Sequence, residues 1–209
     1  GIVIMGFGTS APEMLVSVSA ALDGSPALAL GNAIGSNITN IALVLGATAL
    51  LAALPLQSTV IKREIPLILL AGILSYVLIL DGSLSRLDGI ILMTTLFGML
   101  GWMFYASQKQ SDPVLIEEVN ENLDDEELTS RQAWFWTIAG LLLLVASSQL
   151  LVWGAKGIAI HFGVSDLVIG LTIVAIGTSL PELAASVASA LRGHHDLALG
   201  NIVGSNLFN

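Results

Sequence analysis

A forty-residue segment occurs twice in this chain, at residues 1–40 and 170–209, and each copy places one glutamate inside an otherwise apolar stretch. At a constant offset of 169, 21 of the 40 positions are identical. The identities include polar residues, which shared apolar composition alone would not align. This repeat constrains the fold most, because both copies are expected to form the same helical unit.

The composition places the chain in a lipid bilayer. Hydrophobic residues make up 55% of it, charged residues 11%, and the mean hydropathy is +0.86, far from the averages of soluble domains. Apolar segments near or above the roughly 20 residues that cross a hydrocarbon core recur along the chain. We expect membrane spans at about 1–22, 27–54, 65–80, 89–106, 134–156 and 164–191.

Both ends of the chain lie inside a copy of the repeat. Gly1 is not an initiator methionine, and the apolar segment from residue 197 stops at Asn209 before it could span. We therefore expect the chain to be a fragment of a longer protein. The absence of cysteine excludes disulfides and thiolate metal sites.

One long polar segment, at 107–131, separates the two halves. Its eight acidic residues between Asp112 and Glu127 account for much of the net charge of −9. Clustered like charges repel and stay hydrated, so we expect a solvated connector, with a regulatory cation site as the alternative. The predicted organisation is a first-repeat membrane half at 1–106, this acidic loop, and the start of a second-repeat membrane half at 132–209.

The order of the spans predicts the orientation of the two copies. Glu13 lies on the first expected span and Glu182 on the sixth, five crossings later, so the second glutamate-bearing helix runs the opposite way. The fold class we expect is therefore an all-α integral membrane protein, an inverted-repeat transmembrane helix bundle. Lys and Arg divide five to two between the two sides, which puts the acidic loop in the cytoplasm.

The two glutamates need a counter-charge or a proton. An ionised carboxylate at the bilayer centre costs on the order of 3 kcal/mol on insertion scales, and every Lys and Arg lies at a span end or in a loop. Pro12 and Pro181 precede Glu13 and Glu182, and a proline cannot donate a hydrogen bond to the carbonyl four residues earlier. We expect a distorted helix there that presents main-chain carbonyls to protein or to a wet cavity.

Hydroxyl and amide side chains accompany each glutamate. Thr9 and Ser10, one helical turn before Glu13, share its helix face, and Thr178 and Ser179 repeat that geometry before Glu182. Interleaved glycines in the second half of each copy predict close helix packing. Every fourth position there is polar, which gives the stripes Asn32, Ser36, Asn40 and Asn201, Ser205, Asn209.

These motifs offer oxygen ligands and contain neither sulfur nor imidazole. Such a set favours a hard cation, and Ca²⁺ takes about six to eight oxygens at about 2.3–2.6 Å. Two glutamates balance one divalent charge, and several sodium ions could use overlapping oxygens. Competition for one set of ligands is a physical basis for exchange.

The motifs GTSAPE with GNAIGSNITN and GTSLPE with GNIVGSNLFN resemble the two alpha repeats of the sodium/calcium exchanger family, in the cation/calcium antiporter superfamily, and its prokaryotic members in particular. The resemblance covers about 80 of the 209 residues. It implies a fold of ten transmembrane helices, of which this chain would hold the second to seventh and the start of the eighth. It also implies a multi-pass protein of the prokaryotic inner membrane.

The resemblance implies roles for individual residues. Glu13 and Glu182 would be the central calcium carboxylates. An aspartate stands at the position of Asn209 in potassium-dependent relatives, so asparagine there argues against potassium co-transport. The other implied cation ligands are the main-chain carbonyls of Thr9 and Thr178, the hydroxyls of Ser10, Ser36, Ser179 and Ser205, the main-chain oxygens of Gly6 and Ala175, and the late-position residues Asn40 and Asn209.

The function expected from this resemblance is exchange of sodium for calcium by alternating access, with both ions as transported species and no cofactor. The expected partners are these ions and the lipid bilayer, with no nucleic acid. A proton/calcium antiporter would keep the same glutamates and load protons instead. A cation channel needs a ring of carboxylates, which one inverted pair does not supply, and no HExxH or nucleophile–base pair indicates an enzyme.

Overall fold

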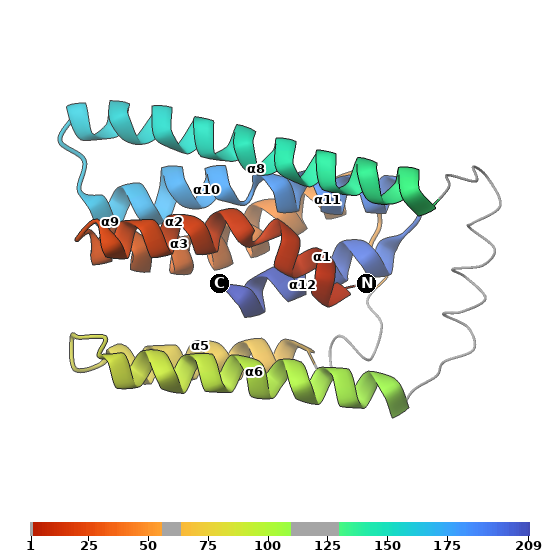
Figure 1. The fold of residues 1–209 in the computed structure, drawn as a ribbon, viewed down its shortest axis with the longest axis horizontal. Helices are drawn as coiled ribbons and strands as arrows, with labels where there is room; N and C mark the ends of the chain where they lie inside the picture. The colour runs from red at the N-terminus through yellow and green to blue at the C-terminus, as the bar shows by residue number, and fades with distance from the viewer. Residues whose placement is uncertain (1, 56–63, 110–129) are drawn as a thin grey trace. The chain divides into compact units, whose positions relative to one another are not determined.

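The computed structural model describes residues 2–55, 64–109 and 130–209, and these are mostly helical, with no strand among them (Figure 1). Two of the helical segments, named η, are π-helices that continue neighbouring α-helices. The elements are α1 (Ile2–Thr9), α2 (Ala11–Leu22), α3 (Pro26–Thr39), η1 (Asn40–Leu45), α4 (Gly46–Leu51), α5 (Ile65–Ile79), α6 (Arg86–Lys109), α8 (Ser130–His161), α9 (Asp166–Ile169), η3 (Gly170–Val174), α10 (Ala175–Thr178), α11 (Leu180–Leu191) and α12 (His195–Phe208).

Each predicted span corresponds to a helix or to an interrupted helix at nearly the predicted position. By length and composition, the continuous segments Pro26–Leu51 and Asp166–Leu191 are long and apolar enough to cross a membrane. Most of the predicted acidic connector lies outside the described residues, so its boundaries at 107 and 131 stay a prediction.

Contacts divide the chain into two units, and residues 1–68 with 140–209 form the unit that holds both repeats. Within each copy the two helical segments pack together, α2 against α3 and α11 against α12. The larger contacts run between copies, because α1 packs on α12 while α3 packs on α9, η3 and α10. Each copy thus places its second helix against the first helix of the other, which is the pattern of a two-fold relation.

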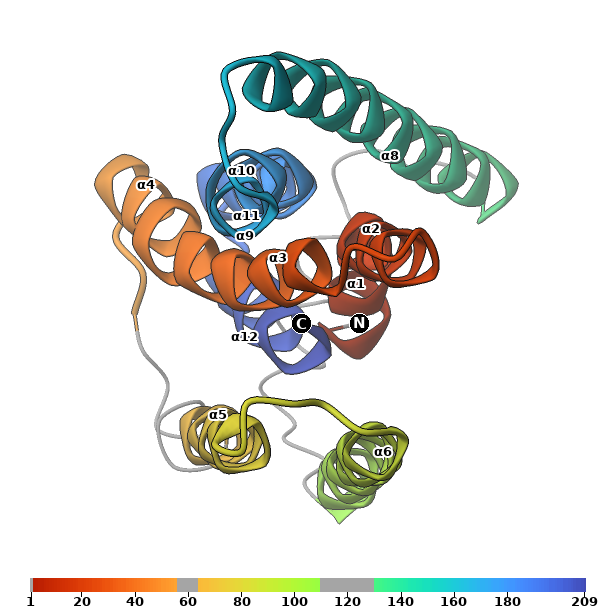
Figure 2. The same cartoon turned by 90° about the vertical axis from the view of Figure 1, so that its left-hand side faces the viewer.

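The two copies run in opposite directions. In Figure 1 the chain passes from right to left through α1 and α2, and from left to right through α9, α10 and α11. In Figure 2 α2 and the superposed segments α9, α10 and α11 are all viewed nearly end-on, so these helices are close to antiparallel. The inverted arrangement predicted from the span count is confirmed.

Glycines allow the copies to approach closely. A Cβ built on Gly35 of α3 would lie 2.6 Å from the carbonyl oxygen of Leu171, and one on Gly31 would lie 2.7 Å from that of Leu167. On the opposite segment, a Cβ on Gly170 would lie 2.6 Å from the Leu28 oxygen. No side chain fits at these crossings, so small residues here set the distance between repeats.

The described residues are polar inside and apolar outside. Both repeat glutamates are buried, while large apolar side chains such as Leu50 (89% exposed) and Leu22 (82%) face outward. A small apolar cluster accompanies the polar interior and consists of Ala20, Leu28, Ile169 and Val174. This distribution suits lipid rather than water as the surrounding solvent.

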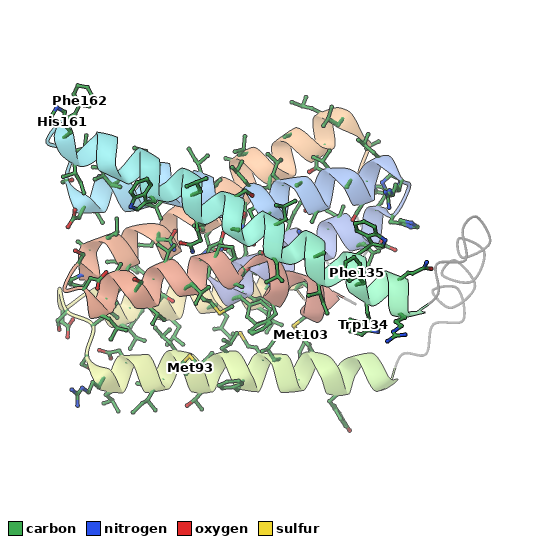
Figure 3. All side chains as sticks on the ribbon, turned by 45° about the horizontal axis from the view of Figure 1, so that its top comes forward. Met93, Met103, Trp134, Phe135, His161 and Phe162 are labelled. Atoms are coloured by element: carbon green, nitrogen blue, oxygen red, sulfur yellow. The ribbon has the colours of Figure 1, made fainter. Side chains whose placement is uncertain are left out.

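Aromatic side chains flank the long helix α8. Trp134 and Phe135 lie near its first turns, and His161 and Phe162 lie at its other end (Figure 3). Phe135 and Phe162 are 63% and 78% exposed. At 1.5 Å per residue the intervening chain spans about 40 Å, close to the thickness of a bilayer with its headgroup regions. Exposed aromatics at this spacing match the belts found at membrane–water interfaces.

The unit of residues 69–139 contains most of α5, all of α6 and the start of α8. Gly82 takes a positive φ of 81° in the turn after α5, a conformation that glycine adopts without steric cost. Ser85 and Asp88 then form a reciprocal cap on α6: the Ser85 main-chain N–H and hydroxyl both donate to Asp88 Oδ2 at 2.7 Å, and the Asp88 main-chain N–H donates to Ser85 Oγ. These hydrogen bonds hold the pKa of the Asp88 carboxyl below its usual value of 3.8.

Candidate cation-binding site

Both glutamate-bearing helices are interrupted at the serine that precedes the proline. Ser10 separates α1 from α2 with φ −80° and ψ 2°, and Ser179 separates α10 from α11 with φ −83° and ψ 2°. The proline then occupies one of the first two positions of the new helix, where its missing N–H is no loss. The distortion predicted from the proline is present in both copies.

Each interruption places a glutamate in the first turn of a helix, where the positive end of the helix dipole favours a carboxylate. Glu13 is 2% exposed and Glu182 is fully buried. In each carboxylate one oxygen, Oε2, is buried and accepts no hydrogen bond. A buried, unpartnered carboxylate oxygen is costly unless a proton or a cation binds it.

The remaining oxygen of each carboxylate is bonded by the other repeat. Ser10 donates to Glu182 Oε1 at 3.2 Å, and Ser179 donates to Glu13 Oε1 at 3.4 Å. Ser205, which belongs to the same repeat as Glu182, also donates to Glu182 Oε1 at 3.0 Å. The two carboxylates therefore sit at the repeat interface, each with a hydroxyl from the opposite copy.

The threonines also bond across the interface. Thr9 donates to Asn201 Oδ1 at 3.0 Å, and Thr178 donates to Asn32 Oδ1 at 3.3 Å. The structure thus forms two polar clusters of the same plan, and each combines residues of both repeats. One contains Thr9, Ser10, Glu182, Asn201 and Ser205, and the other contains Glu13, Asn32, Ser36, Thr178 and Ser179.

The predicted main-chain ligands Gly6 and Ala175 are placed at equivalent points one turn before the breaks. The Gly6 oxygen accepts the Ser10 N–H at 3.0 Å, and the Ala175 oxygen accepts the Ser179 N–H at 3.1 Å. The Thr9 and Thr178 hydroxyls lie 3.4 and 3.3 Å from these oxygens, so each has its single hydrogen shared between a main-chain oxygen and an asparagine oxygen. A hydroxyl that gives its hydrogen to the asparagine leaves the main-chain oxygen available to a cation.

The late-position residues differ from the other polar side chains of the site. Asn40, at the start of η1, is fully buried, yet neither its amide nitrogen nor its amide oxygen has a hydrogen-bond partner. The amide of Asn209, which is half-buried, is likewise without a partner. An unsatisfied amide oxygen is available as a ligand, so both positions remain in the candidate set.

Sequence reasoning missed two residues of this region, Ser17 and Ser186. Each lies one turn after a repeat glutamate and accepts a hydrogen bond from an asparagine, Asn32 in one copy and Asn201 in the other. Ser17 and Ser186 are the same residue type at equivalent positions of the two copies, and this match could have indicated their role from the sequence.

The chemistry of the site is that of oxygen ligands for a hard cation. Among the described residues no group of three or more His, Cys, Asp or Glu side chains could hold a metal ion. The charge at the interface is therefore carried by two carboxylates, surrounded by neutral hydroxyls, amides and main-chain oxygens.

An inverted pair of interrupted helices with buried carboxylates at their interface is the architecture of a secondary transporter. The chain belongs to the sodium/calcium exchanger protein family, which matches residues 1–105 and 132–209. Members of this family are antiporters of sodium and calcium that use no cofactor, and they are not enzymes.

Individual relatives match nearly the whole chain. CaxA of Alkalimonas amylolytica is 52% identical over 100% of this chain and 66% of its own length. The inner membrane protein YrbG of Escherichia coli is 39% identical over 100% of this chain and 65% of its own length. The solved structure of the sodium/calcium exchanger from Methanococcus jannaschii has a TM-score of 0.69 and 35% identity, over 99% of this chain and 64% of that chain. The chain thus spans about two thirds of the length of these three proteins.

Proposed function

We propose that the complete protein carrying this chain exchanges sodium for calcium across a membrane by alternating access. The observation that carries the proposal is the reciprocal arrangement of Glu13 and Glu182: each is bonded by a serine of the opposite repeat and each has one buried oxygen without a partner. The M. jannaschii relative, described as a sodium/calcium exchanger, supports the same reading.

In this proposal Glu13 and Glu182 bind calcium together with the main-chain carbonyls of Thr9 and Thr178. Two carboxylates neutralise one divalent ion, and the neutral oxygens complete the coordination that calcium favours. Sodium ions use the same carboxylates with a second set of ligands, so the two ions compete. That second set consists of the hydroxyls of Ser10, Ser36, Ser179 and Ser205, the main-chain oxygens of Gly6 and Ala175, and the amides of Asn40 and Asn209.

Charge neutralisation links binding to transport. A site with two uncompensated carboxylates would cost on the order of 3 kcal/mol per charge to expose to the apolar interior, so the empty protein would switch slowly. A loaded site is neutral and can change the side that it faces. The sodium gradient then drives calcium movement in the opposite direction. We place the protein in a prokaryotic inner membrane as a multi-pass protein, with the acidic loop in the cytoplasm.

Uptake of calcium-45 into proteoliposomes that contain the complete protein tests this function. An imposed outward sodium gradient should drive uptake, whereas a proton gradient alone should not. Uptake driven only by protons would assign the protein to proton/calcium exchange, which uses the same glutamates. Folded protein without uptake under either gradient would contradict both forms of exchange.

The role of the carboxylates is tested by Glu182→Gln. The substitution keeps the side-chain volume and removes the charge, so we expect sodium-driven calcium uptake to fall to the background of empty liposomes. Asp81→Asn is the control, since Asp81 is an exposed carboxylate in the turn after α5, is bonded by Ser83 and lies outside the two polar clusters. Normal uptake by Glu182→Gln would refute the assigned role.

A further inference from the structure

Four asparagines belong to the two stripes in which every fourth residue is polar. They differ in whether their amides are hydrogen-bonded. Asn40 and Asn209 have amides without hydrogen-bond partners. Asn32 and Asn201 are fully buried, and both their nitrogen and their oxygen are bonded. The difference separates candidate ligands from side chains with another role.

The amide of Asn32 uses all of its bonding capacity. Its nitrogen donates to the main-chain oxygen of Glu13 at 3.0 Å and to Ser17 Oγ at 2.9 Å. Its oxygen accepts the hydroxyls of Thr178 at 3.3 Å and Ser36 at 3.4 Å. A primary amide has two N–H donors and two oxygen lone pairs, so every donor and acceptor of this amide has a protein partner.

Asn201 makes three of the four equivalent bonds in the second repeat, whereas Ser205, the counterpart of Ser36, donates to Glu182 instead. The Asn201 nitrogen donates to the main-chain oxygen of Glu182 at 3.3 Å and to Ser186 Oγ at 3.0 Å, while the Asn201 oxygen accepts the Thr9 hydroxyl at 3.0 Å. The partners are related by the repeat offset, so the arrangement occurs once in each copy.

We propose that Asn32 and Asn201 are positioning residues, each of which ties the main chain of the glutamate in its own repeat to the threonine of the opposite repeat. The inference rests on the proposed function, in which a cation binds oxygens of both repeats at once. Calcium accepts ligands only over about 2.3–2.6 Å, so the relative placement of the two repeats must be held closely. An amide that bridges them directly supplies that restraint.

Loss of the bridge has a defined consequence. Without Asn32, the hydroxyls of Ser17 and Thr178 lose a buried partner, which is unfavourable. The Thr178 hydroxyl already contacts the Ala175 oxygen at 3.3 Å, and with no amide to bond it would bond that oxygen alone. The predicted ligand oxygen would then be less available to an ion, and the two repeats less well aligned.

The test compares Asn32→Leu and Asn201→Leu in the complete protein, reconstituted as above. Residues that orient ligands typically change metal affinity about 10- to 100-fold when removed. We expect the KM for calcium to rise about tenfold in each variant, with the maximal rate per folded protein retained within about threefold. Thr48→Val is the control, because the buried Thr48 hydroxyl, in the same continuous segment, donates to its own helix at the Val44 oxygen and its loss should leave KM unchanged.

Two milder substitutions test the same proposal if a leucine variant does not fold. Ser17→Ala and Ser186→Ala each remove one acceptor of the bridging amide, and we expect the KM for calcium to rise about two- to threefold. Because Ser17 acts here through Asn32, adding Ser17→Ala to Asn32→Leu should change KM no further. Unchanged KM in the serine variants, or a fall in maximal rate at unchanged KM, would overturn the positioning role.

Binding measured without transport separates this inference from the proposed function. Calcium bound to the folded state raises Tm with concentration, and Asn32→Leu or Ser17→Ala should need more calcium for the same rise. If wild-type protein is stabilised by calcium but does not exchange it, the exchange proposal fails while the positioning role is still decided by these shifts. If calcium stabilises wild-type and variants equally, or stabilises none of them, the positioning role is wrong.

Discussion

Replacing Gly35 by alanine tests whether the repeats pack as closely as the structure shows. A Cβ at this position would lie 2.6 Å from the Leu171 oxygen, 2.7 Å from Ala175 Cβ and 2.8 Å from Leu171 Cα. Two of these three atoms belong to the backbone, which cannot rotate away as the end of a flexible side chain can. The methyl group must therefore push α3 away from η3 and α10.

The magnitude follows from two opposing effects. Overpacking a well-packed interior costs about 1–3 kcal/mol, while alanine gains up to about 1 kcal/mol over glycine in a helix interior. With the full propensity gain subtracted, Gly35→Ala should lower the free energy of unfolding by about 0–2 kcal/mol. Gly46→Ala is the matched control, because Gly46 begins α4 in the same continuous segment and, beyond its own helix backbone and chain neighbours, no atom among the described residues lies within 4 Å of its built Cβ.

Equilibrium unfolding of the complete protein in mixed micelles with increasing SDS measures both variants. Since the helix-propensity gain is common to the two substitutions, the difference between them isolates the overpacking cost of about 1–3 kcal/mol. Equal unfolding free energies, within about 0.5 kcal/mol, would refute close packing of α3 on η3. The same displacement moves Ala175 and the start of α11, so calcium affinity should fall in Gly35→Ala and stay unchanged in Gly46→Ala.

Two further predictions concern hydrogen bonds that differ in their consequences. Ser205→Ala removes a 3.0 Å bond to Glu182, whereas Ser36→Ala removes only a 3.4 Å bond to an asparagine. The sodium concentration for half-maximal exchange should therefore rise more in Ser205→Ala than in Ser36→Ala. Equal effects in uptake assays would contradict a special role of the bond between Ser205 and Glu182. At the start of α6, Ser85→Ala should raise the titration midpoint of the Asp88 carboxyl in NMR, because the Ser85 bonds keep that pKa low. A depressed carboxyl pKa stabilises the helix start above the unfolded-state value of about 3.9, and this contribution is lost as the pH falls through the lower folded pKa.

The helix interruptions could be predicted from the sequence because their cause is local. Proline lacks an N–H, so Pro12 and Pro181 disfavour a continuous helix through the preceding turn, and the structure breaks at Ser10 and Ser179. The small-residue face that contains Gly35 is local in the same sense, and its close contact is confirmed.

The partners of these residues could not be predicted, because they come from the other repeat. Helical spacing places Ser10 on the face of Glu13, three residues later, but in the structure its hydroxyl bonds Glu182 instead. Thr9 likewise bonds Asn201. Spacing within one helix describes neighbours on that helix, whereas these bonds depend on how α1 packs against α12.

The π-helix η1 also could not be predicted from the sequence. The segment Pro26–Leu51 has the apolar composition of an ordinary span, and a single turn with wider hydrogen bonding has no residue signature of its own. Its position is informative all the same, since it begins at Asn40, whose amide has no partner. Such turns occur frequently at functional sites.

The hydrogen bonds of the two repeats differ although the residues that make them are the same. Ser205 donates to the carboxylate of Glu182, while Ser36, its counterpart, donates to Asn32. Identical residues at identical positions cannot cause this difference, so it reflects unequal packing of the two copies. A transporter with perfect two-fold symmetry would face both sides of the membrane equally, which alternating access forbids. In the alternating-access cycle proposed above, an exchange of these two arrangements between the repeats would turn the site toward the opposite side.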